Sequence, residues 1–317
     1  MGEVKALTVG VGEDGVRLDR WLRRRWPHLG QSQIHKLART GQIRVDGARA
    51  KADTRLEPGQ VVRVPPLPPA ALPTPHSLTR EDIRFARSLT LFEDDAVLIL
   101  NKPAGLAVQG GTKTLRHIDR LLSAWGEGAE RPRLTHRLDR DTSGVLALGK
   151  SPAAAARLAG AFARRRAEKT YWAIVAGNPK PARGVIDAPL AKIGAGDRER
   201  VTPVEAKDPR AEAAVTEYAM ISRAGPSAAW MALRPLTGRT HQLRAHMLAL
   251  GHPILGDPKY HTPASVELSG PLKLQLHARR LTIPHPSGGM IDVEAPLSPE
   301  MAAGFARFGF ELSEERP

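Results

Sequence analysis

The sequence predicts an α+β protein with two modules, the larger built on a mixed, mainly antiparallel sheet with flanking helices. A proline-rich segment at residues 65–75 divides the chain, because proline at that density disrupts helices and central strands. Beyond it, strand-like runs outnumber helical ones and do not alternate regularly with them, which favours antiparallel pairing. The 317 residues suffice for a core in each module. We expect modules at residues 1–64 and 88–312, joined by a linker at 65–87.

The first module is expected to hold two short helices and a small sheet. Apolar residues recur at helical spacing over residues 18–22, and Pro27 ends that helix. Ser32 is the expected N-cap of a second helix, which a glycine ends. A strand then runs into an Asp46-Gly47 turn, and Val61–Val64 forms the last strand.

The second module is expected to open with a hairpin. Its strands are Leu89–Phe92 and Val97–Leu100, on either side of an acidic turn. Further strands are expected at Val145–Leu148, Tyr171–Val175, Val215–Tyr218, Trp230–Arg234 and Met290–Val293. Helices are expected at Leu115–Trp125, Ala153–Arg166 and His241–Leu250.

The composition points to an acidic partner. The chain holds 47 Lys and Arg against 33 Asp and Glu, a net charge of +14, and such a balance most often indicates nucleic acid. The absence of cysteine excludes disulfides, thiolate nucleophiles and cysteine zinc sites. The sequence has no apolar run of about 20 residues and no secretory leader pattern. We expect a soluble, cytoplasmic protein without membrane contact.

Positive charge is concentrated in the first module, where residues 1–64 hold 13 basic and 7 acidic residues. Much of it falls on the two expected helices. A solvated charged surface is the simpler interpretation. We favour a phosphate-binding face, because so small a module gains little else from crowded cations. Its expected residues are Arg23, Arg24, Arg25, Lys36 and Arg39.

Two glycine-rich segments match nucleotide-binding motifs without the expected context. Gly10–Gly15 fits GxGxxG, but it contains two acidic residues that would repel a pyrophosphate, and no βαβ unit follows. Gly144–Ser151 fits the P-loop pattern GxxxxGK[ST], but its inner Val-Leu-Ala-Leu favours a buried strand. Pro152 also places the helix start after the serine. A P-loop triphosphatase is the less favoured alternative.

Three histidines, His241, His246 and His252, lie close in sequence. No HExxH motif occurs and acidic residues are scarce nearby, so core or RNA-facing histidines are favoured over a metal site.

The strongest chemical signal is HRLDRDTSG at residues 136–144. Asp139 lies just before an apolar, strand-like run, and residues 131–172 hold 10 basic and 3 acidic residues. Neighbouring cations favour an ionised carboxylate, which can act as a nucleophile or base on a negatively charged substrate. A structural salt bridge is the alternative for this aspartate. KTYWA at 169–173 and TGRTHQLRAH at 237–246 add a strand tyrosine and many hydrogen-bond donors.

Together these motifs resemble those of the RluA-type pseudouridine synthases. HRLDRDTSG is similar to the family signature around the catalytic aspartate, KTYWA to its tyrosine motif, and TGRTHQLRAHMLALGHPILGD to its basic motif. LFEDDAVLILNKPAG and LQLHARRLTIPHP also fit, so the resemblance spans residues 88–295. In RLDRWL, QSQIHKL and GQIRVDG, the first module resembles the alpha-L (S4-type) RNA-binding domain. The resemblance implies a small αααβ-type RNA-binding module followed by a pseudouridine synthase catalytic domain.

The resemblance also implies roles for individual residues. Asp139 would be the nucleophile or base, and Arg137 would enter the RNA stack in place of the flipped uridine. Tyr171 would stack on the target base, Arg244 would pair with Asp139 and keep it ionised, and Leu276 would give apolar support beside the base. The implied partner is RNA, with large-subunit (23S) ribosomal RNA expected, and no obligate protein partner is implied. No cofactor and no metal are expected.

These residue types suit the chemistry of uridine isomerisation. A base inside folded RNA must be flipped out to be reached, a planar arginine can fill the gap it leaves, and an aromatic ring can hold it. The other class of function is a non-catalytic ribosome-assembly protein that uses the same basic surface, with Asp139 in a structural ion pair.

Overall fold

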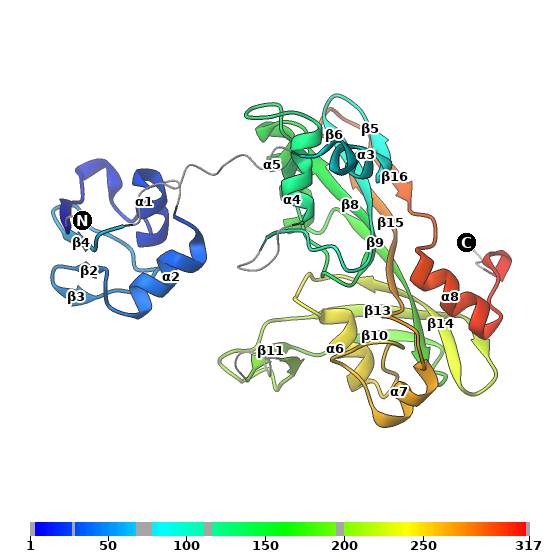
Figure 1. The fold of residues 1–317 in the computed structure, drawn as a ribbon. Helices are drawn as coiled ribbons and strands as arrows, with labels where there is room; N and C mark the ends of the chain where they lie inside the picture. Colours follow the sequence, from blue (N-terminus) through cyan, green and yellow to red (C-terminus); the bar gives the residue numbers. More distant parts are fainter. Residues whose placement is uncertain (1–3, 27–28, 68–77, 111–115, 195–199, 315–317) are drawn as a thin grey trace. The chain divides into compact units, whose positions relative to one another are not determined.

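The computed structural model describes residues 4–26, 29–67, 78–110, 116–194 and 200–314. The chain divides into two units, Met1–Ser77 and Leu78–Pro317 (Figure 1). In the part of the chain that is described, no helix is long and apolar enough to cross a membrane.

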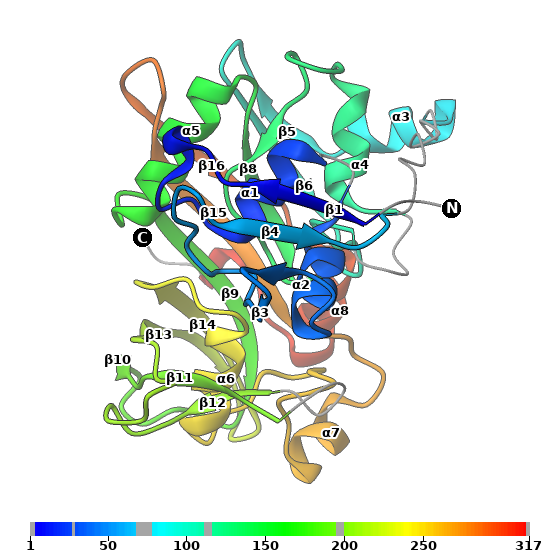
Figure 2. The same cartoon turned by 90° about the vertical axis from the view of Figure 1, so that its left-hand side faces the viewer.

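The first unit is a four-stranded antiparallel sheet packed against two α-helices. Its elements are β1 (Lys5–Thr8), a 3-10 helix (Val11–Glu13), α1 (Leu18–Arg25), α2 (Gln31–Arg39), β2 (Arg44–Val45), β3 (Ala48–Arg49) and β4 (Val61–Val64). The strand order is β1-β4-β2-β3, and β1 and β4 lie side by side in Figure 2. Trp21 from α1, Ile34 from α2 and Val62 from β4 are buried in one shared core.

The structure confirms both helices, the last strand and the turn that the sequence predicts for this unit. Asp46 and Gly47 have φ angles of 48° and 78°, the left-handed pair that a type I′ hairpin requires. Helix α2 begins at Gln31 with Gly30 as its N-cap, two residues earlier than the predicted cap at Ser32. Over its described residues, the unit has two α-helices and a 3-10 turn where the resemblance implied three helices. Pro27 lies outside the described residues.

The second unit is built on a ten-stranded mixed sheet in the order β10-β13-β14-β9-β15-β8-β6-β5, with β16 paired to β15 and β7 to β8. The strands are β5 (Thr90–Glu93), β6 (Val97–Lys102), β7 (Arg133–Leu134), β8 (Ser143–Gly149), β9 (Glu168–Ala176), β10 (Arg183–Asp187), β13 (Val215–Ala224), β14 (Ala228–Pro235), β15 (Leu276–Pro284) and β16 (Met290–Glu294). A separate hairpin comprises β11 (Leu190–Ile193) and β12 (Arg200–Pro203). The β8–β15 pair is parallel and the other described pairs are antiparallel.

Helices cover both faces of this sheet. They are α3 (Arg80–Ser88), α4 (Ile118–Leu121), α5 (Pro152–Ala163), α6 (Gln242–Ala249), α7 (Pro263–Ser269) and α8 (Pro299–Phe308), with 3-10 turns at Leu122–Ala124 and Leu312–Glu314. Along β8, Val145 packs in the core that includes α5, and Leu146 packs in the core that includes α4. Along β9, Val175 packs with α6 and Trp172 packs with α8. Because successive strand residues point to opposite faces, each strand is buried on both sides.

The predicted hairpin and the five further predicted strands are confirmed, and so are the helices α5 and α6. The third predicted helix is present only as α4 and the 3-10 turn after it, and its first predicted residue, Leu115, lies outside the described residues. Residues 80–87, which the sequence analysis assigned to the linker, belong to α3, which Thr79 caps. Strands β7, β10, β11, β12 and β15 and helices α7 and α8 were not predicted.

The P-loop match is a strand followed by a helix. Residues Ser143–Gly149 form β8, whose residues pair with β6 on one side and β15 on the other. Ser151 caps α5 and Pro152 is its first residue, as the sequence predicts. The backbone N–H groups of β8 are therefore used within the sheet and cannot cradle a phosphate.

One row of residues crosses the sheet and positions the site. Gly144 of β8 pairs with Lys102 of β6 and with Ala278 of β15, and Ala278 pairs in turn with Tyr171 of β9. Gly144 has a φ of +110°, and a Cβ there would lie 2.1 Å from the carbonyl oxygen of Ala278. Only glycine permits this approach. It brings the start of β8, and the loop before it, within two strands of Tyr171.

We expect Gly144→Ala to destabilise the protein by more than about 3 kcal/mol, because the added methyl group overlaps the β15 backbone and the φ angle is unfavourable for alanine. Urea denaturation measures the change. Gly160→Ala is the matched control: it lies within α5 with open space around it, so alanine should stabilise the helix by about 0.5–1 kcal/mol. Equal effects at both positions would contradict the packing account.

Candidate active site

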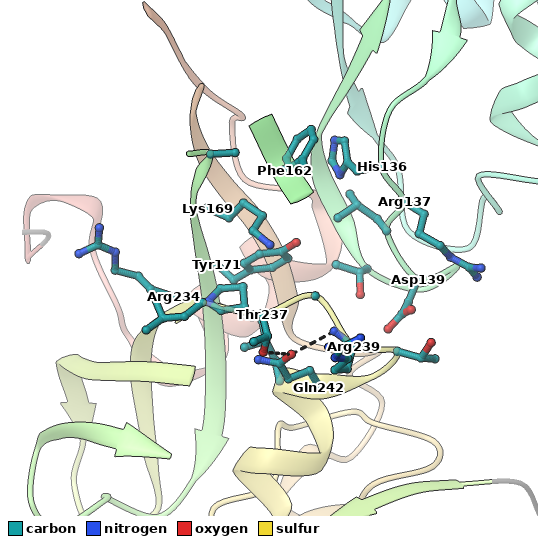
Figure 3. A pocket seen from close by; sticks show the side chains of 18 of the residues that line it. His136, Arg137, Asp139, Phe162, Lys169, Tyr171, Arg234, Thr237, Arg239 and Gln242 are labelled. Carbon is teal, nitrogen blue, oxygen red and sulfur yellow. Dashed lines mark hydrogen bonds between the residues drawn. The ribbon is translucent and has the colours of Figure 1, made fainter. Parts of the chain in front are cut away.

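A cleft of about 660 Å³ opens in the second unit. Its walls come from the loop before β8, the end of α5, strand β9, the segment from β14 into α6, and the start of β15. It contains all five residues to which the sequence analysis gave roles in catalysis or base flipping within this unit, namely Arg137, Asp139, Tyr171, Arg244 and Leu276. Figure 3 shows Tyr171 and Asp139 on opposite sides of the same space.

The loop that carries Asp139 is held by a buried lysine. The Lys102 ammonium, with no exposed surface, donates hydrogen bonds to the carbonyl oxygens of Pro103, Leu106 and Arg140 at 2.8–2.9 Å. The Arg140 guanidinium returns a bond of 3.0 Å to the Gly105 carbonyl. These bonds join the loop after β6 to the turn before β8, so Asp139 projects from a rigid turn.

Burial lowers the pKa of Lys102 to about 7, against the opposing attraction of Asp141 and Asp139. The lysine is thus a buried donor whose charge depends on the neighbouring carboxylates. Its three carbonyl partners satisfy all three of its N–H groups.

Asp139 does not pair with Arg244, contrary to the expectation from the family resemblance. Arg244, on α6, donates two hydrogen bonds of 2.6 Å to the carboxylate of Asp257. Both partners are buried, with 5% and 0% of their side-chain surface exposed. The backbone N–H groups of Lys259 and Tyr260 also donate to Asp257, so this carboxylate is fixed to receive the flat guanidinium.

Arg244 still acts on Asp139 through its charge. Burial is the largest influence and disfavours the guanidinium, but the hydrogen bonds that Arg244 donates to Asp257, with the charges of Asp257 and Asp139, together outweigh it and raise the pKa of Arg244. The Asp257 carboxylate therefore holds the positively charged Arg244 beside the cleft. Arg244 itself makes no direct bond to Asp139.

His241 lies beside Asp139. Its Nε2 lies 3.9 Å from a carboxylate oxygen of Asp139, and its Nδ1 lies 3.0 Å from the hydroxyl of Tyr260. Burial lowers the pKa of His241 and outweighs the attraction of Asp139. His241 also has a φ of 52° as the N-cap of α6. The sequence motif contained this histidine, but its spacing gave no sign of contact with Asp139.

Tyr171 offers a ring and a protonated hydroxyl to the cleft. Burial, and secondly the charge of Asp139, raise the pKa of Tyr171 above its ordinary value. Leu276 is 3% exposed and belongs to the same apolar cluster as the tyrosine ring. Lys169 lies next to Tyr171 in Figure 3, and burial lowers the pKa of Lys169. The cleft thus presents an aromatic face opposite a carboxylate.

Arg137 is exposed at the edge of the cleft, two residues before Asp139. Figure 3 shows its side chain directed away from Tyr171. In this position the guanidinium is available to a ligand that enters the cleft.

The other two histidines of the sequence cluster have structural partners. His246 contacts the Thr216 hydroxyl and the Ala188 carbonyl, and His252 contacts the Ala176 carbonyl. Within the described ranges, no group of three or more His, Cys, Asp or Glu side chains is arranged to hold a metal ion.

In the first unit, four of the five expected phosphate-binding residues are exposed: Arg23, Arg24, Lys36 and Arg39. Arg25 differs, because its guanidinium binds the Glu13 carboxylate at 2.8–2.9 Å and stacks over the Trp21 ring. The bond from Arg25 is the largest cause that lowers the pKa of Glu13 to about 2. Glu13 in the GxGxxG match is thus a structural partner for Arg25, and Arg25 is not part of an open cationic face.

Comparison with known proteins identifies the class that this fold and cleft define. Residues 96–249 match the sequence profile of the RNA pseudouridylate synthase family. The solved structure of human RNA pseudouridylate synthase domain containing 4 is 29% identical with a TM-score of 0.61, over 73% of this chain and 98% of that one.

Relatives match over nearly the full length. The ribosomal large subunit pseudouridine synthase C of Pasteurella multocida is 34% identical over 94% of this chain and 92% of its own. An uncharacterized RNA pseudouridine synthase of Synechocystis is 35% identical over 93% and 89%. The chain belongs to the RluA-type family of RNA pseudouridine synthases.

We expect Asp257→Asn to destabilise the protein by about 3–5 kcal/mol, because it leaves the buried Arg244 guanidinium without a countercharge. The free energy of unfolding in urea measures this. Asp292→Asn is the control, since it breaks a half-exposed pair with Arg280 and should cost about 0–1 kcal/mol. A similar small loss for both variants would show that Arg244 does not depend on Asp257.

Proposed function

We propose that this enzyme isomerises specific uridines to pseudouridine in large-subunit (23S) ribosomal RNA, in the cytoplasm. The choice of RNA is supported by the full-length similarity to relatives named as ribosomal large subunit pseudouridine synthases. The observation that carries the proposal is the shared cleft, where Asp139 faces Tyr171 beside the cation of Arg244.

The reaction is an intramolecular rearrangement of the nucleoside. The bond between N1 of uracil and C1′ of ribose breaks, the uracil turns, and C5 bonds to the same carbon, while the proton on C5 is lost to solvent and N1 gains one. No oxidant or reductant is needed, because electrons balance within the nucleoside.

We assign Asp139 as the group that attacks the nucleoside or removes its proton. Its carboxylate sits on a turn fixed by Lys102, with 22% of its side chain exposed toward the cleft. Arg244 supplies positive charge beside the reacting carboxylate. Asp257 orients Arg244. The positive charge of Arg244 is therefore already in place, although Asp139 does not hold it.

Tyr171 and Leu276 form the platform for the flipped uracil. Stacking on an aromatic ring stabilises an extruded base by about 1–3 kcal/mol, and the buried leucine supports the ring from the sheet side. Because the tyrosine hydroxyl stays protonated, it acts as a hydrogen-bond donor at neutral pH.

Arg137 is the residue that we propose enters the RNA stack. Extrusion of a base costs a few kcal/mol, and a planar guanidinium can replace the lost stacking. The exposure of Arg137 at the edge of the cleft supports this role.

The first unit is proposed to be an RNA-binding domain of the alpha-L type. Its exposed cations on α1 and α2 would contact backbone phosphates, with Arg23, Arg24, Lys36 and Arg39 as the contact residues. Arg25 is left out of this set, because Glu13 already binds it.

The two alternatives have less support. A P-loop triphosphatase is disfavoured because the matching residues form β8. A non-catalytic assembly factor would need Asp139 in a structural ion pair, whereas Arg244 bonds to Asp257 and His241 is 3.9 Å from Asp139.

We expect Asp139→Asn to lower pseudouridine formation at least about 10³-fold while RNA affinity stays within about twofold, because the amide cannot act as nucleophile or base. Tritium release from 5-tritiated uridine in large-subunit RNA measures the reaction, and filter binding measures affinity. Asp95→Asn, in the exposed turn between β5 and β6 and outside the cleft lining, is the control and should keep most of the activity. Turnover by Asp139→Asn at the wild-type rate would contradict the assignment.

For the first unit, we expect replacement of Arg23, Arg24, Lys36 and Arg39 by glutamine to weaken RNA binding and flatten its salt dependence. Each lost phosphate contact lowers the slope of log K against log salt by about 0.7–0.9. The matched control removes four exposed charges elsewhere in the unit, at Lys5, Arg49, Lys51 and Arg63. An equal change in slope from both sets would mean that overall charge, not this face, binds RNA.

A further inference from the structure

Helix α5 ends in an unusual way. The backbone N–H of Arg166 bonds to the carbonyl of Ala161, and that of Arg165 bonds to Phe162. This is the Schellman arrangement, in which the residue after the C-cap takes a left-handed conformation that glycine normally supplies. Here that residue is Arg165, with a φ of 58°.

An arginine in this position is strained where glycine would not be. In the described ranges, the other non-glycine residues with positive φ are Asp46, in a tight hairpin turn, and His241, beside Asp139. Strained residues of this kind persist where the side chain is needed. The fold therefore bears a backbone cost at Arg165, which lines the cleft as the strained His241 does.

The three arginines of this turn border two hollows of the surface. Arg165 lines the cleft that holds Asp139 and Tyr171. Arg164 and Arg166 line a second hollow of about 390 Å³, together with Arg157 of α5 and His285 after β15. The turn is therefore the wall between the active cleft and a neighbouring basic groove.

The charges of the turn are open to solvent. All three arginines are exposed, and over the described residues none of the three has an ion pair or side-chain hydrogen bond. The other two basic side chains of the groove already have partners, since Arg157 donates to the Pro286 carbonyl and the His285 ring lies 3.0 Å from an Asp94 carboxylate oxygen. Three adjacent free guanidinium groups repel one another unless an anion with several charges binds.

We propose that the Arg164–Arg166 turn binds consecutive backbone phosphates of the RNA strand that carries the target uridine. Arg165 contacts a phosphate at the mouth of the cleft, and Arg164 and Arg166 contact phosphates of the strand as it continues along the groove. The inference rests on the proposed function, since it takes the ligand of the cleft to be RNA. Guanidinium groups suit this role because they bind phosphate oxygens through two parallel hydrogen bonds.

The test uses Arg165→Gly in the full-length chain. Glycine suits the left-handed position, so the variant should fold and have an equal or higher Tm than the wild type. We expect kcat/KM for tritium release from large-subunit RNA to fall about tenfold or more, as for one lost charge-assisted contact. The slope of log K against log salt, from filter binding, should fall by about 0.7–0.9.

Two further variants define the surface. Arg164→Gln with Arg166→Gln should lower the slope by about twice as much, because two contacts are lost. Arg223→Gln is the matched control for charge. Arg223 is exposed near one end of β13, and the other end of that strand, at Val215, bonds to Thr237 of the cleft. It should leave kcat/KM and the slope unchanged.

The outcomes separate the two claims. If the wild type releases no tritium from this RNA, the proposed function fails. If the wild type is active and Arg165→Gly keeps both its kcat/KM and its salt slope, the phosphate contact is overturned, and a protein partner with acidic residues becomes the candidate for this turn. A fall in kcat/KM with an unchanged slope also overturns it, because the loss would then not arise from a phosphate.

Discussion

The close approach of β8 to β15 at Gly144 is the constraint on which the rest of the site depends. This parallel pair joins the two halves of a sheet whose other described pairs are antiparallel. Because Gly144 has no side chain, the Ala278 backbone can lie close to it, and Ala278 pairs in turn with Tyr171 on the next strand. Since Asp139 precedes β8 by a single turn, the pairing that closes the sheet also sets the carboxylate opposite the tyrosine.

The electrostatics of the site are arranged in layers. Asp139 is partly exposed, and beside it lies His241, whose pKa is lowered. The basic side chains behind them have other partners: Arg244 is held by the buried Asp257, and Lys102 is held by three carbonyl groups. The cations are thus fixed by other partners, and Asp139 is left free to react. A direct ion pair would have to break before the carboxylate could reach a substrate.

The sequence was sufficient to predict the α+β class, most strands of the large sheet and the residues of the cleft. Strong local signals account for this, such as the apolar run of β8 and the Asp46-Gly47 turn. The partner of Arg244 could not be predicted, because Asp257 and Asp139 are both plausible carboxylates in sequence and only packing decides between them. Strand β15 was missed because basic and histidine residues interrupt its apolar pattern, as in Leu276–Arg280. The left-handed Arg165 was hidden inside a segment predicted to be helical.

The central claim is that a flipped uridine occupies the cleft between Asp139 and Tyr171. A crystal structure of the Asp139→Asn protein bound to a large-subunit RNA fragment with its target uridine tests this most directly. The account predicts that the uracil stacks on the Tyr171 ring, that its ribose C1′ lies in contact with residue 139, and that the Arg137 guanidinium fills the gap in the RNA. A uridine that stays stacked in the RNA, or is bound away from the cleft, would contradict it.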